Sequence, residues 1–281
     1  MKNIVFAIFL FLFQNSFCQS GIDEDAIRQN AMSISRFDTL DTRLAEIFEE
    51  KRLILIGELQ GTAEPAEFVN YLVQNLVSQG RKVNVGLEIS PQDMPNSKEL
   101  NDAIALRNCN FFKNESFDKG SQAWFSLITE ILQAKNAKFF FFGLTKKQLN
   151  SGIHHADSLM FLNIKSEMLK DTGALFICLT KNKHGKLTGD QFPVPMGYYF
   201  LQDKLLDLSL FNMVSFNNEC VEGGAYFNTG NGARLHTMQN SDYFYTITGM
   251  RNYFSFTHQL IDHSYNGVLF TYHITASFAM P

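Results

Sequence analysis

Four consecutive aliphatic residues, 53–56, constrain this chain more than any other stretch, because a turn sequence follows them directly. A short apolar run of this kind is typical of a β-strand that is covered on both faces. Gly57 and Gly61 bracket the turn and tolerate backbone conformations that other residues resist. Between them lies Glu58, and Thr62 can cap a following helix. The pattern predicts a buried strand that ends in a carboxylate beside a helix start.

A second strand of the same kind follows. Residues 64–79 carry apolar side chains at helical spacing, and residues 83–89 form another apolar strand, which ends in Glu88 and Ile89. A strand–helix–strand order of these lengths indicates a right-handed parallel unit, so both strands end at one edge of the sheet. Glu58 and Glu88 can therefore face each other across this edge, where ligands bind in open α/β sheets.

Predicted strands and helices continue to alternate along the chain, and the last third is predicted to be rich in β-strands instead. His184 follows the fourth predicted strand by a few residues and so reaches the same edge. Beyond it we expect β-rich segments and one Gly/Asn-rich loop, at residues 217–232. The other predicted elements are a leading helix within 21–52, helices at 121–136 and 154–170, strands at 137–144 and 174–179, and β segments at 210–216, 243–248 and 267–274.

These elements indicate an α/β fold. We expect a single domain over residues 21–281, with a largely parallel central sheet, flanking helices and a β-rich C-terminal third. Hydrophobic residues make up 45% of the 281 residues, which is enough for a sizeable core. The net charge is −4 and no basic block occurs, so nucleic-acid binding is not indicated.

The first residues have the composition of a secretory signal peptide. Lys2 is followed by an apolar run that is too short to span a bilayer, and small residues precede a cleavage position between Cys18 and Gln19. We therefore expect residues 1–18 to be removed and the chain to be exported to the periplasm or the extracellular space. No later segment is long and apolar enough to cross a membrane.

Signal cleavage would leave three cysteines, which allows at most one intrachain disulfide. Cys178 lies within an apolar strand and is predicted to be a buried core thiol. Cys109 and Cys220 lie near turn-rich stretches and are the predicted pair, if any pair forms. The sequence contains no CxxC motif and no Cys/His zinc spacing.

Two carboxylates and a histidine at one sheet edge suggest a catalytic or metal-binding site. Closely held carboxylates raise one another's pKa, and a nearby His can act as general base. Glu58, Glu88 and His184 are also a plausible oxygen and nitrogen set for a divalent metal. Each residue has a plainer explanation as well. Glu58 can bond turn amides at a helix start, Glu88 can be a solvated turn residue, and His184 lies in a Lys-rich polar loop.

Three short motifs resemble the erythromycin esterase-like, ChaN-like and TIKI group of α/β proteins. They are Gly-Glu-Leu-Gln-Gly-Thr at 57–62, Gly-Leu-Glu at 86–88 and Thr-Lys-Asn-Lys-His at 180–184. The likeness spans most of residues 50–281, and includes Pro-Met-Gly-Tyr-Tyr at 195–199. The resemblance implies an α/β fold with a hydrolytic site at the strand-end edge, or haem or metal binding in other branches.

The resemblance carries over only in part. Glu58 and Glu88 match the group's two carboxylates, and His184 matches its later His. Gln60 stands where the group's first motif has His, and Lys181 stands where Gly precedes the Asn. Two further positions, Gly120 and Ala156, stand where close relatives are expected to carry Arg. These departures remove proton-transferring and basic groups.

Two functions are therefore expected. The first is a hydrolase, with an esterase favoured, in which Glu58 and Glu88 hold and activate water, Gln60 orients it, and His184 is the remaining base or a substrate contact. The second is an impaired relative that binds a small ligand, haem or a metal without turnover, because Gln cannot take up a proton near neutral pH. The expected partner is a small molecule, and the cofactor is either none or a divalent metal, with haem a weaker alternative.

Overall fold

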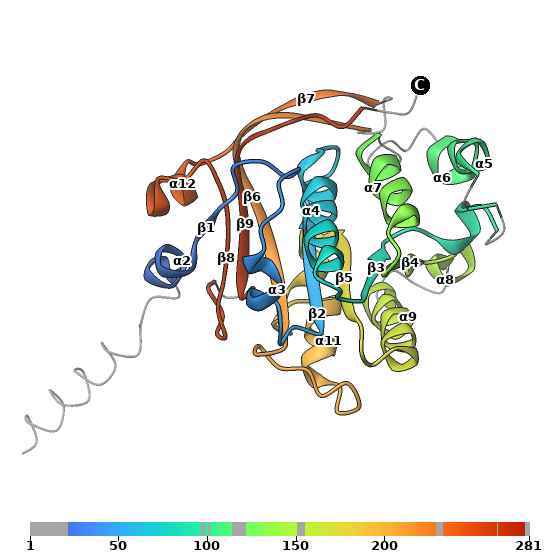
Figure 1. Cartoon of the computed structure of the whole chain (residues 1–281), viewed down its shortest axis with the longest axis horizontal. Helices are drawn as coiled ribbons and strands as arrows, with labels where there is room; N and C mark the ends of the chain where they lie inside the picture. Colours follow the sequence, from blue (N-terminus) through green and yellow to red (C-terminus); the bar gives the residue numbers. More distant parts are fainter. Residues whose placement is uncertain are drawn as a thin grey trace, which may run out of the picture.

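A computed structural model describes residues 22–96, 99–100, 102–113, 122–150, 155–228, 233–262 and 264–278. The predicted signal peptide at residues 1–18, its cleavage position and Gly120 lie outside the described residues. Within them, helices flank a nine-stranded, mostly parallel sheet, and strands dominate the C-terminal region (Figure 1). The predicted α/β fold class is thus confirmed.

The strands of the sheet are β1 (Met32–Ser33), β2 (Leu53–Glu58), β3 (Val83–Leu87), β4 (Ala137–Phe141), β5 (Leu175–Lys181), β6 (Met213–Asn228), β7 (Ala233–Gln239), β8 (Asn252–Phe256) and β9 (Gly267–Ile274). The helices are α2 (Glu24–Asn30), α3 (Arg43–Ile47), α4 (Glu64–Ser78), α5 (Ala103–Arg107), α6 (Asn110–Lys113), α7 (Gln122–Gln133), α8 (Lys146–Asn150), α9 (Ala156–Lys170), α10 (Asn182–Gly185), α11 (Met196–Gln202) and α12 (Tyr243–Thr248), with a 3-10 turn, η1, at Pro91–Asp93.

The strand order is β1-β8-β9-β6-β2-β5-β3-β4, and β7 pairs with β6. The six strands from β9 to β4 are joined by parallel ladders, whereas β7, β8 and β1 pair antiparallel. Strand β5 therefore lies between β2 and β3, so the two strands of the first parallel unit are not neighbours. The carboxyl ends of β2, β5 and β3 nevertheless form one edge.

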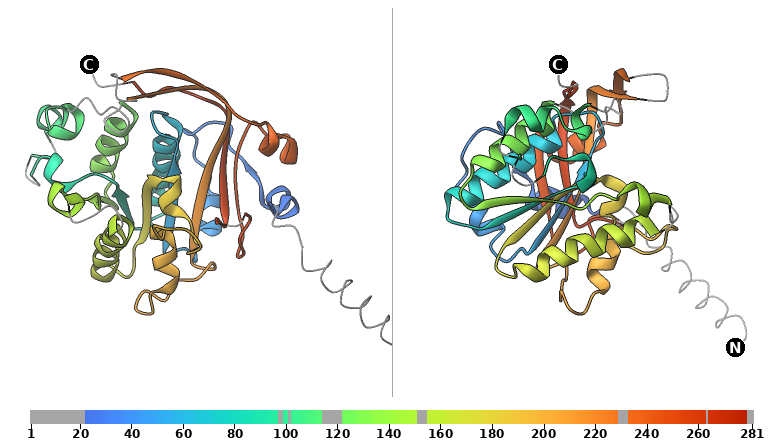
Figure 2. Two further views of the ribbon diagram at one scale, coloured as in Figure 1. Left: turned by 180° about the vertical axis from the view of Figure 1, so that it is seen from behind. Right: turned by 90° about the vertical axis from the view of Figure 1, so that its right-hand side faces the viewer.

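The two faces of the sheet carry separate hydrophobic cores, because successive side chains of a buried strand point to opposite faces. On one face, Ile54 and Ile56 of β2 pack beneath α4 and α7. On the other face, Leu53 and Leu55 pack with apolar side chains of α9 and α11. Figure 2 shows α4 and α7 on one side of the sheet and α9 on the other.

Three predicted elements differ from the structure. Residues 21–52 contain α2, β1 and α3 rather than one leading helix, because β1 pairs with β8. Residues 243–248 form α12, not a strand, although their aromatic side chains favour a strand; Gly249 ends this helix at φ 69°. Residues 217–228 are the second half of β6, because β9 and β7 satisfy their backbone groups.

Cys109 and Cys220, the predicted pair if any pair forms, are not joined by a disulfide in the structure. Both are buried free thiols, and so is Cys178. Cys109 lies in the core beneath α4 and α7, where its Sγ lies 4.0 Å from the sulfur of Met94. Cys220 lies on β6, where the side-chain amide of Asn240 donates to its sulfur. The prediction of Cys178 as a core thiol is confirmed, and burial raises its pKa.

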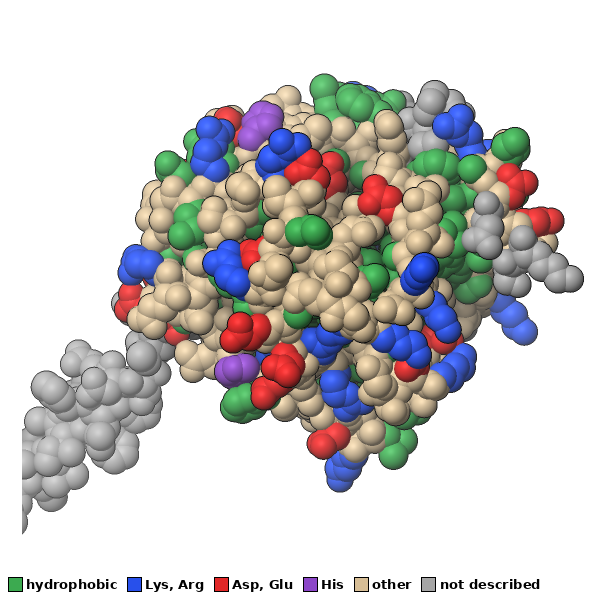
Figure 3. Space-filling view, in the orientation of Figure 1, with side chains coloured by type: hydrophobic (Ala, Val, Ile, Leu, Met, Phe, Trp, Pro, Cys, Tyr) green, Lys and Arg blue, Asp and Glu red, His purple; other side chains and the backbone are tan. Residues whose placement is uncertain are grey.

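Charged side chains of both signs are interspersed on the face of the molecule in Figure 3. None of the helices in the described residues is both long enough and apolar enough to cross a membrane.

The turn after β2 is clamped between two distant segments. Gly61 has φ 77°, and a Cβ at this position would lie 2.4 Å from the carbonyl oxygen of Tyr226 on β6. The carbonyl of Gly61 accepts hydrogen bonds from the amides of Tyr226 and Ser277, both at 2.9 Å. Only glycine meets both the conformation and the close approach.

We expect Gly61→Ala to lower the free energy of unfolding by about 1–3 kcal/mol, because Ala adds both a strained φ and a clash with backbone. Gly173→Ala is the matched control, since a Cβ there meets nothing within 4 Å. Urea unfolding of both variants measures the difference. Equal stability of the two variants would contradict this account of the turn.

Candidate active site at the strand-end edge

Glu58 ends β2 and is almost fully buried. By strand alternation its side chain lies on the same face as Ile54 and Ile56, beneath α4 and α7. It is 4% exposed, and the indole Nε1 of Trp124 on α7 donates a hydrogen bond of 3.0 Å to its Oε1. Trp124 is itself 1% exposed and packs in the core of this face. The carboxylate is thus held by a buried, neutral donor.

Glu88 follows β3 directly and is held by the end of β5. Its Oε2 accepts hydrogen bonds from the hydroxyl of Thr180 at 2.7 Å and from the amide of Lys181 at 3.2 Å. Thr180 follows Cys178 by two positions on β5, so the two side chains lie on the same face of the sheet, the face that α9 covers. The hydrogen bond from Thr180 to Glu88 therefore lies towards the opposite face from Trp124. Glu58 and Glu88 were predicted to face each other across the edge. In the structure β5 lies between their two strands, so they do not end neighbouring strands.

The short helix α10 starts at this edge and is locked to it by Asn182. The side-chain amide of Asn182 donates to the carbonyl of Asn218, and its Oδ1 accepts from the amide of Asn218, both at 3.0 Å. A Cβ on Gly57 would lie 1.7 Å from that Oδ1, so glycine makes room for the Asn182 side chain. The hydroxyl of Tyr265 donates to the Asn182 carbonyl at 2.7 Å.

His184, on α10, is paired with Asp157 near the start of α9. The ring Nδ1 lies 2.7 Å from Asp157 Oδ1, and both side chains are largely buried, with 11% and 8% exposed. The same oxygen accepts the amide of Met196 at the start of α11, at 2.8 Å. Because an ionised carboxylate only accepts, this contact assigns a proton to Nδ1 and leaves Nε2 to accept one. His184 is therefore oriented, not a loose surface residue.

A C-terminal segment covers the β2 end of the edge. Thr275 accepts the amide of Ala63, and the Thr275 amide donates to Oε1 of Glu64 at 2.6 Å. Ser277 and Phe278 continue the segment to the start of α7, where the amides of residues 122 and 123 donate to them. Glu64 is 5% exposed, and its burial raises the pKa of its carboxyl to about 7.

The remaining predicted site residues are placed as follows. Gln60 is half-buried in the turn between β2 and α4. Ala156 is the first residue of α9, next to Asp157. In the described parts of the chain, no three His, Cys, Asp or Glu side chains group closely enough to hold a metal ion. Glu58, Glu88 and His184 are thus not gathered into such a set.

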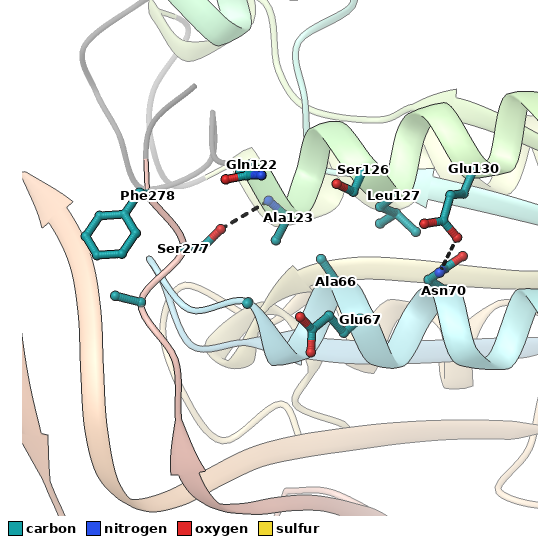
Figure 4. A pocket seen from close by; sticks show the side chains of 12 residues that line it. Ala66, Glu67, Asn70, Gln122, Ala123, Ser126, Leu127, Glu130, Ser277 and Phe278 are labelled. Atoms are coloured by element: carbon teal, nitrogen blue, oxygen red, sulfur yellow. Dashed lines mark hydrogen bonds between the residues drawn. The ribbon is translucent and has the colours of Figure 1, made fainter. Parts of the chain in front are cut away.

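A surface groove of about 390 Å³ lies beside this edge, between α4 and α7 (Figure 4). Small side chains, including Ala66 and Ala123, leave the space between the helices. Asn70 donates to Glu130 at one end, and the hydroxyl of Ser277 accepts the Ala123 amide at the other. Neither Glu58 nor Glu88 lines this groove, so it is separate from the predicted site.

Sequence reasoning missed the residues that hold the predicted ones. Trp124 and Asp157 fall within the predicted helices at 121–136 and 154–170, and neither has a predicted role. Asn182 was part of a motif but had no role. Partners of this kind come from other elements of the fold, so no local pattern could identify them. The one available signal is that Asp157 is a carboxylate within the predicted helix at 154–170.

The raised pKa of Glu64 predicts a pH-dependent stability. Its carboxyl ionises near pH 4.5 in the unfolded chain and near pH 7 in the folded protein, so folding loses stability as pH rises through this window. The Gln side chain of the Glu64→Gln variant stays neutral at every pH. The free energy of unfolding of this variant should therefore exceed that of the wild type by about 1–3 kcal/mol at pH 8, but not at pH 4. Urea unfolding between pH 4 and 8 measures this difference. A difference independent of pH would contradict the assignment.

The His184–Asp157 pair predicts a defined imidazole tautomer. Asp157→Asn removes the negative acceptor and should lower the unfolding free energy by about 1–3 kcal/mol, because a buried charge-assisted hydrogen bond is lost. It should also shift the His184 ring nitrogens in NMR spectra away from the Nδ1-protonated form. Asp190→Asn is the control, because Asp190 is exposed and accepts a hydrogen bond from the nearby Thr188 hydroxyl. An unchanged His184 spectrum would contradict the pairing.

The fold was compared with known proteins. No protein-family model and no curated protein matches this sequence. Solved structures do match. An erythromycin esterase variant in its open conformation aligns with TM-score 0.65 and 10% identity, over 88% of this chain and 98% of the esterase.

Two further structures align over 92% of this chain and 98% of their own length. One is a succinoglycan biosynthesis protein, with TM-score 0.63 and 11% identity, and the other is a protein from Bacillus cereus, with TM-score 0.62 and 10% identity. Identities this low show a shared fold and nothing more specific. At the level of the fold, the predicted resemblance to the group that contains the erythromycin esterases is confirmed.

Proposed function

We propose that the protein is a hydrolase that cleaves an ester, or less readily an amide, in a small molecule bound at the strand-end edge. The observation that carries the proposal is the His184–Asp157 pair, with its 2.7 Å contact between Nδ1 and Oδ1. A carboxylate that orients one ring nitrogen leaves the other to take a proton from water, which is the arrangement of a general base. His184 lies on α10, which follows β5 directly, at the edge where ligands bind in such sheets, and Asp157 reaches it from the start of α9.

The other residues have supporting roles in the proposed reaction. Glu58 and Glu88 accept hydrogen bonds from an attacking water and hold it, and Gln60 orients it through its side-chain amide. His184 takes one proton as the water oxygen bonds to the substrate carbonyl carbon. The same proton then passes to the leaving alcohol as its bond to that carbon breaks. Export of the chain, as its first residues predict, would bring the site to substrates outside the cytoplasm.

A binding protein without turnover is the alternative, and one residue favours it. Gln60 stands where the resemblance predicts a His, and Gln does not accept a proton near neutral pH. If that His is the water-activating base in relatives, its loss removes a step worth about 10²- to 10⁴-fold. The ligand would then be a small molecule, with haem or a divalent metal as further alternatives.

An activity screen of the purified chain on a broad panel of esters, with and without Mn²⁺, tests the proposal. We expect turnover that Glu88→Gln and His184→Asn each reduce by at least about 100-fold, because each removes a group from water activation. Glu167→Gln is the matched control, since Glu167 is a carboxylate of α9 that pairs with Lys170 away from the edge. Turnover that survives Glu88→Gln would contradict the assigned roles.

The single tryptophan of the chain separates hydrolysis from binding alone. Trp124 donates to Glu58, so a ligand at this edge should change its fluorescence. A fluorescence change on ligand addition, with no turnover on any ester, would establish the binding alternative. Turnover gained by Gln60→His in that case would show an intact scaffold with one missing base. A Soret shift on haem addition would identify haem as the ligand.

A further inference from the structure

Several buried side chains among the described residues have polar atoms for which the structure shows no hydrogen-bond partner, and three of these side chains lie close to α4 and β9. They are Glu64 at Oε2, Asn218 at both side-chain amide atoms, and Thr271 at Oγ1. Their exposed fractions are 5%, 1% and 3%. A buried polar atom that lacks a partner costs free energy, so proteins usually satisfy such atoms, often with ordered water. These side chains are not part of the proposed reaction.

Two of these side chains lie together on neighbouring strands. Asn218 follows Phe216 by two positions on β6, and Thr271 follows Leu269 by two positions on β9, so all four side chains share one face. Phe216 and Leu269 belong to the core beneath α4. The strands pair in parallel, with Asn218 opposite Leu269 and Cys220 opposite Thr271. Asn218 and Thr271 therefore lie diagonally across one ladder, above the apolar core.

Glu64 approaches the same place from above the sheet. It is the first residue of α4, and the buried side chains of this helix cover the face that carries Asn218 and Thr271. Its Oε1 accepts the amide of Thr275, four positions after Thr271, which ties the carboxyl to the end of β9. Glu58 lies on the same face of β2, the strand next to β6. Glu64, Asn218 and Thr271 thus lie on one face of the sheet, on the side that α4 covers.

We propose that Glu64, Asn218 and Thr271 enclose a chamber that binds one or more internal water molecules. The four atoms of these three side chains include two acceptors, one donor group and a hydroxyl that does either. Water donates to the carboxylate and to the amide oxygen, and accepts from the amide nitrogen, so it can satisfy all of them. An anion would be repelled by Glu64. The proposed water site is independent of the hydrolysis proposed above.

A crystal structure of the wild-type protein tests the occupant directly. We expect density for water within hydrogen-bond distance, about 2.7–3.2 Å, of Glu64 Oε2 and of the Asn218 amide. Absence of density at this place would overturn the proposal. Density of a larger molecule or a metal ion would overturn water as the occupant.

The sign of a stability change gives a second test. Thr271→Val keeps the shape of the side chain but removes its hydroxyl. If water bonds that hydroxyl, the variant should melt about 2–4 °C below the wild type, because the water loses a partner. If the hydroxyl has no partner, its replacement by a methyl group should raise the melting temperature, and this result would overturn the proposal.

Thr62→Val is the control for that measurement. Thr62 is 2% exposed, and its hydroxyl donates to the Leu59 carbonyl at 2.7 Å, so its loss should lower the melting temperature whatever fills the chamber. If Thr271→Val does not fold, the wild-type density decides the question alone.

Discussion

The strand-end edge depends on the side-chain amide of Asn182. The parallel ladder between β2 and β6 ends at the pair of Ile56 and Phe216, and beyond it the amide exchanges two hydrogen bonds with the backbone of Asn218. The Asn182 amide thus bonds Asn218 where the backbone of β2 would otherwise continue the ladder. It fits there because Gly57 has no side chain. Because Asn182 also opens α10, the same interaction fixes the helix that carries His184.

The groups at this edge are each fixed by a partner from a different element. Trp124 of α7 holds Glu58, the end of β5 holds Glu88, and Asp157 of α9 holds His184. Their supports lie on both faces of the sheet. Such an arrangement keeps the charged groups in place without requiring them to touch one another, and it leaves the edge between them for water and ligand.

Patterns that depend on a single element were read correctly from the sequence. The apolar run at 53–56 and the helical stripe of α4 depend on burial of one local segment, and both appear in the structure. Residues 217–228 were expected to be a loop because they are rich in Gly and Asn. That composition does not show that β7 and β9 pair with this segment and make it a strand. The position of β5 between β2 and β3 is equally invisible, since strand order follows from packing of the whole chain.

The same limit applies to the site. The motifs identified Glu58, Glu88 and His184 as residues near one edge, but the partners Trp124 and Asp157 lie in helices whose pattern only indicates burial. Cys109 and Cys220 do not pair for a related reason, because closeness to turns in the sequence does not show where a side chain is buried in the fold.

The clamp on the turn after β2 has a consequence for how the protein is made. Thr275 bonds Glu64 across 211 positions of sequence, and Ser277 bonds Gly61. The turn that carries Glu58 therefore emerges early in synthesis but acquires its cover only when the last strand has emerged. Contacts so distant in sequence are slow to form. Until then the turn lacks these contacts, so we expect completion of this edge to be a late step in folding.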